Sequence, residues 1–246
     1  MLRFFVKLEN ISSEKILITD EDFNHIKNVL RLRKGDSFVV CDGNCTDYNV
    51  VLEDYSPNSA IAKIIESNIN TNEPDIEVTL FQGIPKSDKM DLIIQKSIEL
   101  GVKRIVPVLT EHTVVKLNSE KDVNNKLTRW QRIAYEAAKQ CNRGIIPQIE
   151  TPVAFKDAIV LSKEYDLSLI PYEKEEGNKL KSYLVGTNAK NVSIIIGPEG
   201  GFSSNEVQFA LQGDVIPVTL GPRILRTETA GFVALSIVMY ELGDVG

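Results

Sequence analysis

The feature that most constrains the fold is a strand–loop–helix pattern late in the sequence. The run from Val192 to Ile196 is apolar and rich in β-branched residues, which predicts a strand buried on both faces. It stops at residues 197–201, Gly-Pro-Glu-Gly-Gly, which predict a tight loop whose backbone can approach a ligand closely. Ser203 then gives an N-cap signal for a short helix.

The same pattern follows a second time. Residues 215–220 predict another strand, which Gly221 and Pro222 interrupt, and Thr227 is the expected N-cap of a helix from about residue 228 to 242. Two such units in succession are expected to place both loops at the carboxyl ends of neighbouring strands. In parallel α/β sheets that edge is where ligands bind. The alternative is a pair of ordinary β–α turns with glycine punctuation.

The composition is that of a globular protein of one large or two modest domains, because the chain has 246 residues, 43% of them hydrophobic and 25% charged. A net charge of −6 argues against a general nucleic-acid coat but leaves room for a local basic patch. The longest nearly apolar run, Phe232 to Tyr240, is too short to span a bilayer, so no membrane partner is expected.

The cysteines argue against a disulfide framework and against a metal site. There are three of them, Cys41, Cys45 and Cys141, and no C-x-x-C spacing occurs. Because disulfides are rare in the cytosol, a cytoplasmic location is expected.

The two halves of the chain have different patterns of predicted secondary structure. Closely spaced strand-like segments up to residue 65 predict a small β-barrel, with one helix from Asp20 to about Leu30 and Thr19 as its N-cap. The polar stretch 67–74 is the best linker, which gives domains 1–70 and 71–246. Strands and helices then alternate, which predicts an α/β domain with a mostly parallel sheet and helices on both faces. Strands are expected at 77–81, 104–109 and 167–171, and helices at 86–100, 119–142, 155–161 and 180–184.

Residues 25–34 are the basic part of the N-terminal half. They include Lys27, Arg31, Arg33 and Lys34 and no acidic residue. Cations clustered in this way can contact nucleic-acid phosphates. The alternative is a solvated helix end, where cations also complement the helix dipole.

The two loop sequences together, GPEGG at 197–201 and LGPRILRTETA at 220–230, resemble the SPOUT class of RNA methyltransferases. More narrowly they resemble the RsmE family, which methylates ring nitrogen N3 of a uridine in the 16S RNA of the small ribosomal subunit. The pattern H-x-x-x-V-L-R-L-x-x-G-D, which begins at His25, resembles the PUA-like N-terminal domain of that family. The resemblance implies a deep trefoil knot in the C-terminal domain, a homodimer, S-adenosylmethionine as methyl donor, and ribosomal RNA or the assembled small subunit as partner.

Methyl transfer to a uridine nitrogen needs a donor pocket and a means of stabilising the uridine anion, and it needs no metal. The pocket implied by the resemblance is formed by backbone groups and apolar walls at the ends of three strands. Its expected residues are Ile170, Pro171, Tyr172, Gly197, Pro198, Gly200, Gly201, Leu220, Gly221, Ile224, Leu225 and Thr229.

Arg226 is the first candidate for stabilising the uridine anion or gripping its phosphate, because a guanidinium presents fixed hydrogen-bond donors. Its alternative role is as an ion-pair partner of Glu199 or Glu228. Those two acids are candidates for the base or for orienting Arg226, and Glu228 can also be a plain acid at a helix N-terminus. The sequence leaves open which of them takes the proton.

The expected RNA contacts extend beyond the basic segment. They are Arg3, Lys27, Arg31, Arg33 and Lys34 in the first domain, and Lys89, Gln140 and Arg143 in the second, where Gln140 and Arg143 match a QxxR-like element of the family. The helix that carries this element could instead meet a second subunit. Two other functions stay open: a SPOUT enzyme acting on a ribose 2′-hydroxyl or another base, and an RNA-binding module without activity.

Overall fold

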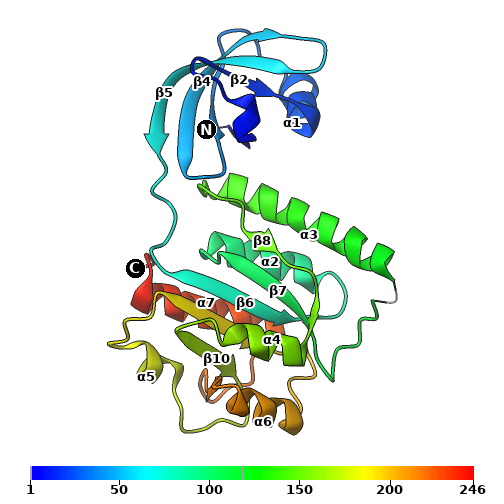
Figure 1. Cartoon of the computed structure of the whole chain (residues 1–246), viewed down its shortest axis with the longest axis vertical. Helices are drawn as coiled ribbons and strands as arrows, with labels where there is room; N and C mark the ends of the chain where they lie inside the picture. Colours follow the sequence, from blue (N-terminus) through cyan, green and yellow to red (C-terminus); the bar gives the residue numbers. More distant parts are fainter. Residues whose placement is uncertain (1, 118) are drawn as a thin grey trace. The chain divides into compact units, whose positions relative to one another are not determined.

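The structure, a computed structural model, describes residues 2–117 and 119–246 (Figure 1). The chain divides into two compact units. Unit 1 comprises the residues up to Glu73 together with Ala138–Ile146, and unit 2 comprises Pro74–Ala137 and Pro147–Gly246. The sequence predicts a single break after residue 70. The structure also assigns the short segment 138–146 to the first unit, and its side-chain contacts, described below, explain why.

Unit 1 is built on one five-stranded sheet in the order β1-β3-β4-β5-β2. The β1–β3 pair is parallel and the other pairs are antiparallel. All five strands contribute to a single hydrophobic core, so the sheet curls around it. The elements are β1 (Arg3–Phe5), the 3-10 helix η1 (Leu8–Asn10), β2 (Lys15–Ile18), α1 (Asp20–Asn24), the π-helix η2 (His25–Leu30), β3 (Ser37–Cys41), β4 (Thr46–Tyr55) and β5 (Ala60–Ile69).

The predicted helix of unit 1 is present but changes character halfway. The α-helical part ends at Asn24, and a π-helical turn continues to Leu30, where Arg31 adopts a left-handed conformation with φ 53°. Thr19 occupies the N-cap position as predicted. Its hydroxyl donates to the Asp20 carboxylate and does not accept a helix N–H. Lys27 therefore lies on a π-turn, a geometry that is often found at functional sites, and the other three cations of the basic segment follow it.

Unit 2 contains a parallel sheet in the order β12-β10-β11-β6-β7-β8, with β9 also paired to β7. The elements are β6 (Glu77–Gly83), α2 (Lys89–Glu99), β7 (Arg104–Leu109), α3 (Glu120–Gln140), β8 (Gln148–Ile149), β9 (Val153–Ala154), α4 (Phe155–Ser162), β10 (Leu167–Pro171), α5 (Leu180–Leu184), β11 (Asn191–Ile196), α6 (Ser204–Gln212), β12 (Ile216–Val218) and α7 (Thr227–Leu242). Within residues 2–117 and 119–246, no helix is both long and apolar enough to cross a bilayer.

Helices cover both faces of this sheet (Figure 1). Phe81 and Ile195 point to the face where α4 and α6 pack against each other. Their chain neighbours Gln82 and Ile196 point to the opposite face, close to Gly231 of α7. Helix α7 also contacts α2 and α5. The alternation follows from strand geometry, in which successive side chains point to opposite faces.

The prediction that the strands before the two loops are neighbours is wrong. Strand β10 lies between β11 and β12, because Leu169 pairs with Ile194 on one side and with Ile216 on the other. Local patterning predicts each strand but carries no information about which strand enters between two others. All three strands are parallel, so the end of β10 lies between the two loops. Three predicted walls of the pocket thus meet at one sheet edge.

Candidate active site

The Gly-Pro-Glu-Gly-Gly loop after β11 is held by a tight turn and by contacts that leave no room for a side chain at Gly200. Gly201 has φ 66°, and its N–H donates to the Pro198 carbonyl at 2.9 Å, which closes a tight turn. His112 Nδ1 lies 2.9 Å from the Gly200 carbonyl oxygen and 3.2 Å from that of Gly201. A Cβ on Gly200 would lie 2.8 Å from the His112 Cβ. The loop is therefore braced from the carboxyl end of β7.

The same loop is packed against the end of β6. A Cβ on Gly83 would lie 2.6 Å from the Pro198 nitrogen and 2.9 Å from the Gly197 carbonyl carbon. Real Cβ atoms do not approach backbone so closely, so only glycine fits at residue 83 without a shift. The loop after β11 therefore packs directly against the end of β6.

Helix α7 begins at this junction, and the role predicted for Thr227 is wrong. Arg226 occupies the N-cap position, and no side chain caps the helix. Thr227 is the first helical residue, and its buried hydroxyl donates to the Gly197 carbonyl at 2.6 Å and accepts from the Gln82 side-chain amide at 2.9 Å. This bond to the loop satisfies the part-buried Gly197 carbonyl and takes the place of a local cap.

The N-cap predicted for the preceding helix is confirmed. The Ser203 side chain accepts from the Glu206 N–H, and the Glu206 carboxylate accepts from the Ser203 N–H, which is a complete capping box. The other Glu206 oxygen accepts from the Glu111 N–H at 2.9 Å. Glu206 therefore ties the start of α6 to the loop after β7.

Lys89 brings together the two acids that the sequence singles out. Its Nζ lies 3.1 Å from Glu199 Oε1 and 3.4 Å from Glu228 Oε2. The Glu199 carboxylate also accepts the Lys86 N–H, at 3.2 Å to each oxygen. Among the residues that the structure describes, Glu228 Oε2 has no hydrogen-bond donor, so its contact with Lys89 is an ion pair of imperfect geometry.

These contacts set the ionisation of the group. Burial raises the pKa of Glu199, but hydrogen bonds from the backbone N–H groups of Glu199 and Lys86, together with Lys89, outweigh it and hold the pKa below its ordinary value. The hydrogen bond to Glu199 raises the pKa of Lys89, and the charges of Glu199 and Glu228 add to that effect. Glu199 and Lys89 are therefore a carboxylate and an ammonium at neutral pH, and Glu228 contacts the same ammonium.

Arg226, predicted as the residue that acts on the uridine, is exposed next to this cluster in sequence. Its guanidinium makes no hydrogen bond or ion pair with any residue in 2–117 or 119–246. The alternative role as a partner of Glu199 or Glu228 is not seen, because Lys89 holds both acids. The guanidinium keeps its donors available to a ligand.

The loop after β12 presents backbone donors and apolar side chains to solvent. In the described part of the chain, no acceptor is found for the N–H groups of Leu220, Ile224 and Leu225. The Ile224 side chain is 86% exposed. Gly221 has φ 113° with open space around it. Free backbone donors beside an apolar surface suit a nucleoside, which has polar edges and a flat apolar face.

The remaining predicted pocket residues lie on the same sheet edge. Ile170 is buried in the core under α4 and α6, and Pro171 and Tyr172 follow it half-buried at the end of β10. The Tyr172 N–H donates to the Val218 carbonyl, which links this strand end to β12. Thr229 is exposed in the first turn of α7. Among the described residues, no group of three or more His, Cys, Asp or Glu side chains could hold a metal ion.

The basic segment of unit 1 presents its cations to solvent. Lys27, Arg31, Arg33 and Lys34 are all exposed. Lys27 Nζ lies 5.1 Å from the centre of the Phe23 ring and 5.7 Å from that of Tyr55, so its position is restrained by cation–π contacts.

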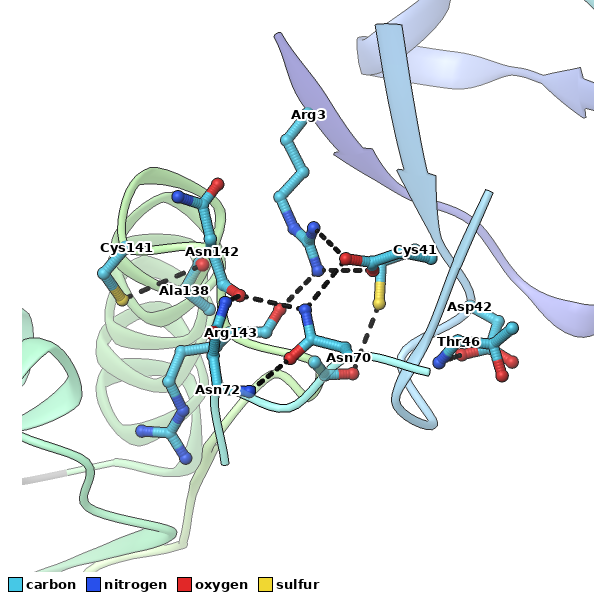
Figure 2. A network of polar contacts seen from close by, with 12 residues as sticks. Arg3, Cys41, Asp42, Thr46, Asn70, Asn72, Ala138, Cys141, Asn142 and Arg143 are labelled. Atoms are coloured by element: carbon cyan, nitrogen blue, oxygen red, sulfur yellow. Dashed lines mark hydrogen bonds and ion pairs between the residues drawn. The ribbon is translucent and has the colours of Figure 1, made fainter. Parts of the chain in front are cut away.

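Two other predicted RNA contacts, Arg3 and Arg143, are placed differently by the structure. Both are buried, with 6% and 3% of their surface exposed. The Arg3 guanidinium forms two bonds of 2.7 Å to the Asp47 carboxylate and one of 2.8 Å to the Arg143 carbonyl (Figure 2). The guanidinium of Arg143 binds Glu73 with bonds of 2.9 and 2.6 Å. Since neither charge reaches the surface, we do not retain a direct RNA contact for them, whereas Gln140 is exposed.

This buried cluster is what attaches residues 138–146 to unit 1. The Asn70 side-chain amide donates to Asp47 and to the Asn142 carbonyl, and Cys41 Sγ donates to the Gly144 carbonyl (Figure 2). Burial raises the pKa of the Cys41 thiol to about 12, so it acts as a neutral donor. Of the two residues in the QxxR-like element, Arg143 is therefore a buried structural residue, and Gln140 is exposed.

Three contributors to the site were not anticipated from the sequence. They are Gln82, His112 and the backbone of Lys86, each of which bonds to a residue at least 88 positions away. The sequence could have indicated them only through their positions, because each lies at or just after the end of a strand whose carboxyl end is at this edge.

Three features define the class of this protein: the parallel sheet of unit 2, the glycine loop that packs against the end of β6, and the five-stranded sheet of unit 1. Residues 71–239 match the family described as RNA methyltransferase domain, and residues 18–65 match the RNA methyltransferase PUA domain. The chain is therefore an RNA methyltransferase with a PUA domain.

The relatives narrow the class to one family. The ribosomal RNA small subunit methyltransferase E of Bacillus subtilis (strain 168) is 34% identical and covers 98% of this chain and 97% of its own. Its namesake from Mesomycoplasma hyopneumoniae (strain 232) is 37% identical, with 96% and 98% covered. The crystal structure of the Neisseria gonorrhoeae protein of that name, bound to S-adenosyl methionine, matches with a TM-score of 0.89 at 31% identity over 100% of both chains. The chain belongs to the RsmE family of small-subunit ribosomal RNA methyltransferases.

Proposed function

We propose that this protein transfers the methyl group of S-adenosylmethionine to ring nitrogen N3 of a uridine in the 16S RNA of the small ribosomal subunit. The observation that carries the proposal is the exposed Arg226, which has no acceptor among the described residues and lies beside braced glycine loops. Membership of the RsmE family and the cofactor-bound relative support the reaction class and the donor.

The residues at the sheet edge suit this cofactor. The N–H groups of Leu220, Ile224 and Leu225 would hold the polar edge of its nucleoside, with Tyr172 and the Ile224 side chain as apolar walls. The Lys89, Glu199 and Glu228 cluster carries a net charge of −1 (two carboxylates and one ammonium), which favours a cationic sulfonium over the neutral product. When bound, the sulfonium supplies an electrophilic methyl group and leaves as a thioether.

Arg226 acts on the acceptor. Uridine N3 must lose its proton before it attacks the methyl carbon, and the resulting charge is shared with the two adjacent carbonyl oxygens. A guanidinium donates to such oxygens and stabilises the anion more than the neutral base. Glu199 is a poor proton acceptor because its pKa is held low, so the proton passes to Glu228 or to water.

The experiment is methylation of small subunits or 16S RNA that lack the modification, followed by mass spectrometry of the nucleosides. We expect N3-methyluridine, and Arg226→Ala is expected to lower kcat by about 100-fold or more with nearly unchanged affinity for S-adenosylmethionine. Arg223→Ala, an exposed arginine of the same loop, is the matched control. A nucleoside methylated on its ribose, or on another atom of its base, would contradict the assignment of N3. Full activity of Arg226→Ala would contradict the role of Arg226 in stabilising the uridine anion.

The finer expectations of partner and fold belong to the same proposal. We propose a homodimer, which is what the resemblance to the RsmE family implies. Light scattering tests it, and a monomer at micromolar concentration would contradict it. The trefoil knot, the cytoplasmic location, the remaining pocket residues and the RNA contacts of the basic segment stay predictions.

A further inference from the structure

We infer that Lys89 is a positioning residue for methyl transfer: by holding Glu199 and Glu228 together it fixes the donor loop to helix α7 and keeps Arg226 unpaired. The inference rests on the proposed function. It replaces the expectation, drawn from the sequence, that Lys89 contacts RNA.

Lys89 joins three separate segments of the chain. Lys89 is the first residue of α2, Glu199 belongs to the loop after β11, and Glu228 lies in the first turn of α7. The side chains are 33%, 26% and 15% exposed, so the group is shielded more than a surface ion pair. Such shielding strengthens each interaction.

The loop after β11 depends on Lys89 at the side that faces α2. His112 and Gly83 hold the glycines of the loop, while Glu199 is held by Lys89 and by the Lys86 N–H. Without Lys89, the Glu199 carboxylate keeps the backbone bond but loses its only cation among the described residues. The loop that would bind the cofactor then has one fewer tie to α2.

Lys89 also balances the charge of the two acids. Glu199 and Glu228 carry two negative charges, and Lys89 is their shared cation. If Lys89 is removed, Arg226 is the next cation along the chain from Glu228, and pairing with the two acids would occupy the donors that the reaction needs. Lys89 therefore acts on catalysis through Arg226, with no contact of its own to the reacting atoms.

A direct RNA contact and a positioning role predict different losses. A lysine that contacts phosphate should change the KM for RNA and the salt dependence of binding, while kcat and cofactor affinity stay constant. A positioning lysine should change kcat and cofactor affinity, with little effect on the salt dependence of RNA binding. A purely structural lysine should change the unfolding temperature and nothing specific to either substrate.

The experiment compares Lys89→Met and Lys89→Arg with Lys96→Met, which removes a lysine from a salt bridge with Glu99 on the same helix. For Lys89→Met we expect at least a 10-fold fall in kcat and weaker binding of S-adenosylmethionine by calorimetry, with an unchanged salt slope for RNA. Lys89→Arg should restore much of both, and Lys96→Met should resemble the wild type. A change confined to the KM for RNA and the salt slope would overturn the inference.

A pH series gives a second readout. Lys89 helps to hold the pKa of Glu199 low, so that pKa should rise in Lys89→Met. The affinity of the variant for S-adenosylmethionine should then fall more steeply than that of the wild type as the pH decreases from neutral towards the ordinary pKa of a glutamate. Parallel curves for the two proteins would count against the positioning role.

The double variant Lys89→Met, Glu199→Gln tests the release of Arg226, because the low pKa of Glu199 makes it a poor proton acceptor, whereas Glu228 can take the uridine proton. Removing one of the two uncompensated carboxylates should raise kcat above that of Lys89→Met by several-fold, whereas independent structural losses would lower it further. Equal or lower activity would overturn the argument from charge. If the wild type binds the cofactor but methylates no ribosomal RNA, the proposed function fails. The affinity of Lys89→Met for the cofactor would still test whether the Lys89–Glu199 contact holds the loop.

Discussion

The hydroxyl of Thr227 donates a hydrogen bond of 2.6 Å to the carbonyl of Gly197, although the two residues belong to different strand–loop–helix units. Thr227 also accepts from the amide of Gln82 at the end of β6. One buried hydroxyl thus joins the start of α7 to two strand ends. The orientation of the helix that carries Arg226 depends on this junction.

Thr227→Val should therefore destabilise the protein while keeping the shape of the side chain. The substitution leaves the Gly197 carbonyl without the Thr227 donor and removes one of the two hydrogen bonds of the Gln82 amide, which keeps its bond to the Gly83 carbonyl, at a cost of about 1–3 kcal/mol. The free energy of unfolding in urea measures it. Thr227→Ser keeps the hydroxyl and is the control. A loss under about 0.5 kcal/mol in Thr227→Val would mean that the two groups find other partners.

Gly83→Ala should test the packing between β6 and the donor loop. A Cβ at this position would lie 2.6 Å from the nitrogen of Pro198, so the loop must move or the strand must shift. We expect a loss of about 1–3 kcal/mol in the free energy of unfolding and weaker binding of S-adenosylmethionine. Gly177→Ala is the matched control, because its nearest neighbour is the end of a flexible side chain at 3.5 Å. Equal behaviour of the two variants would contradict the close approach.

The sequence predicts the elements of unit 2 well where periodicity and breakers coincide. The strands at 104–109 and 167–171 and the helix at 180–184 have the predicted bounds. The helix expected from residue 86 begins only at Lys89, because Ser87 has φ 57°, a left-handed conformation that interrupts a helix. Local physics therefore locates the elements and misplaces some of their ends.

The arrangement of the site could not be predicted in the same way. The position of β10 between β11 and β12 and the bond between Lys86 and Glu199 join segments that are far apart in sequence. The motifs predicted which side chains gather at the sheet edge. They could not predict that Lys89 holds both acids, because an exposed and a paired lysine have the same local sequence signal. Arg143 is the reverse case: the sequence predicts an exposed arginine that contacts RNA, and the structure shows a buried arginine bound to Glu73.

Asp47→Asn should make the stability of unit 1 less dependent on pH. Burial raises the pKa of Asp47, but hydrogen bonds from Arg3 and Asn70 and the charge of Arg3 outweigh it and hold the pKa below its ordinary value. A lowered pKa stabilises the fold above the ordinary pKa, and the stabilisation is lost as the pH falls through the folded-state pKa. The variant should therefore be less stable than the wild type at pH 7, by about 1–3 kcal/mol, and the difference should shrink below about pH 4.

Urea unfolding followed by circular dichroism at several pH values measures this difference. Asp54→Asn in the same unit is the control, because Asp54 is exposed and, among the residues that the structure describes, its carboxylate accepts only from the neighbouring Tyr55 N–H. A gap between wild type and Asp47→Asn that stays constant with pH would show that the Arg3–Asp47 pair does not carry the effect.

The exposed cations of the basic segment should bind RNA through phosphates, without reading sequence. Lys27→Ala, Arg31→Gln, Arg33→Ala and Lys34→Ala each remove one exposed charge from the π-turn and the residues after it. Each substitution should weaken binding of a ribosomal RNA fragment and lower the slope of log K against log salt by about 0.7–0.9 for each phosphate that the variant no longer neutralises. Lys63→Ala, an exposed lysine of β5 in the same unit, is the control. If the four variants of the segment kept the wild-type slope, as the control should, these cations would be a solvated helix end, which is the alternative that the sequence leaves open.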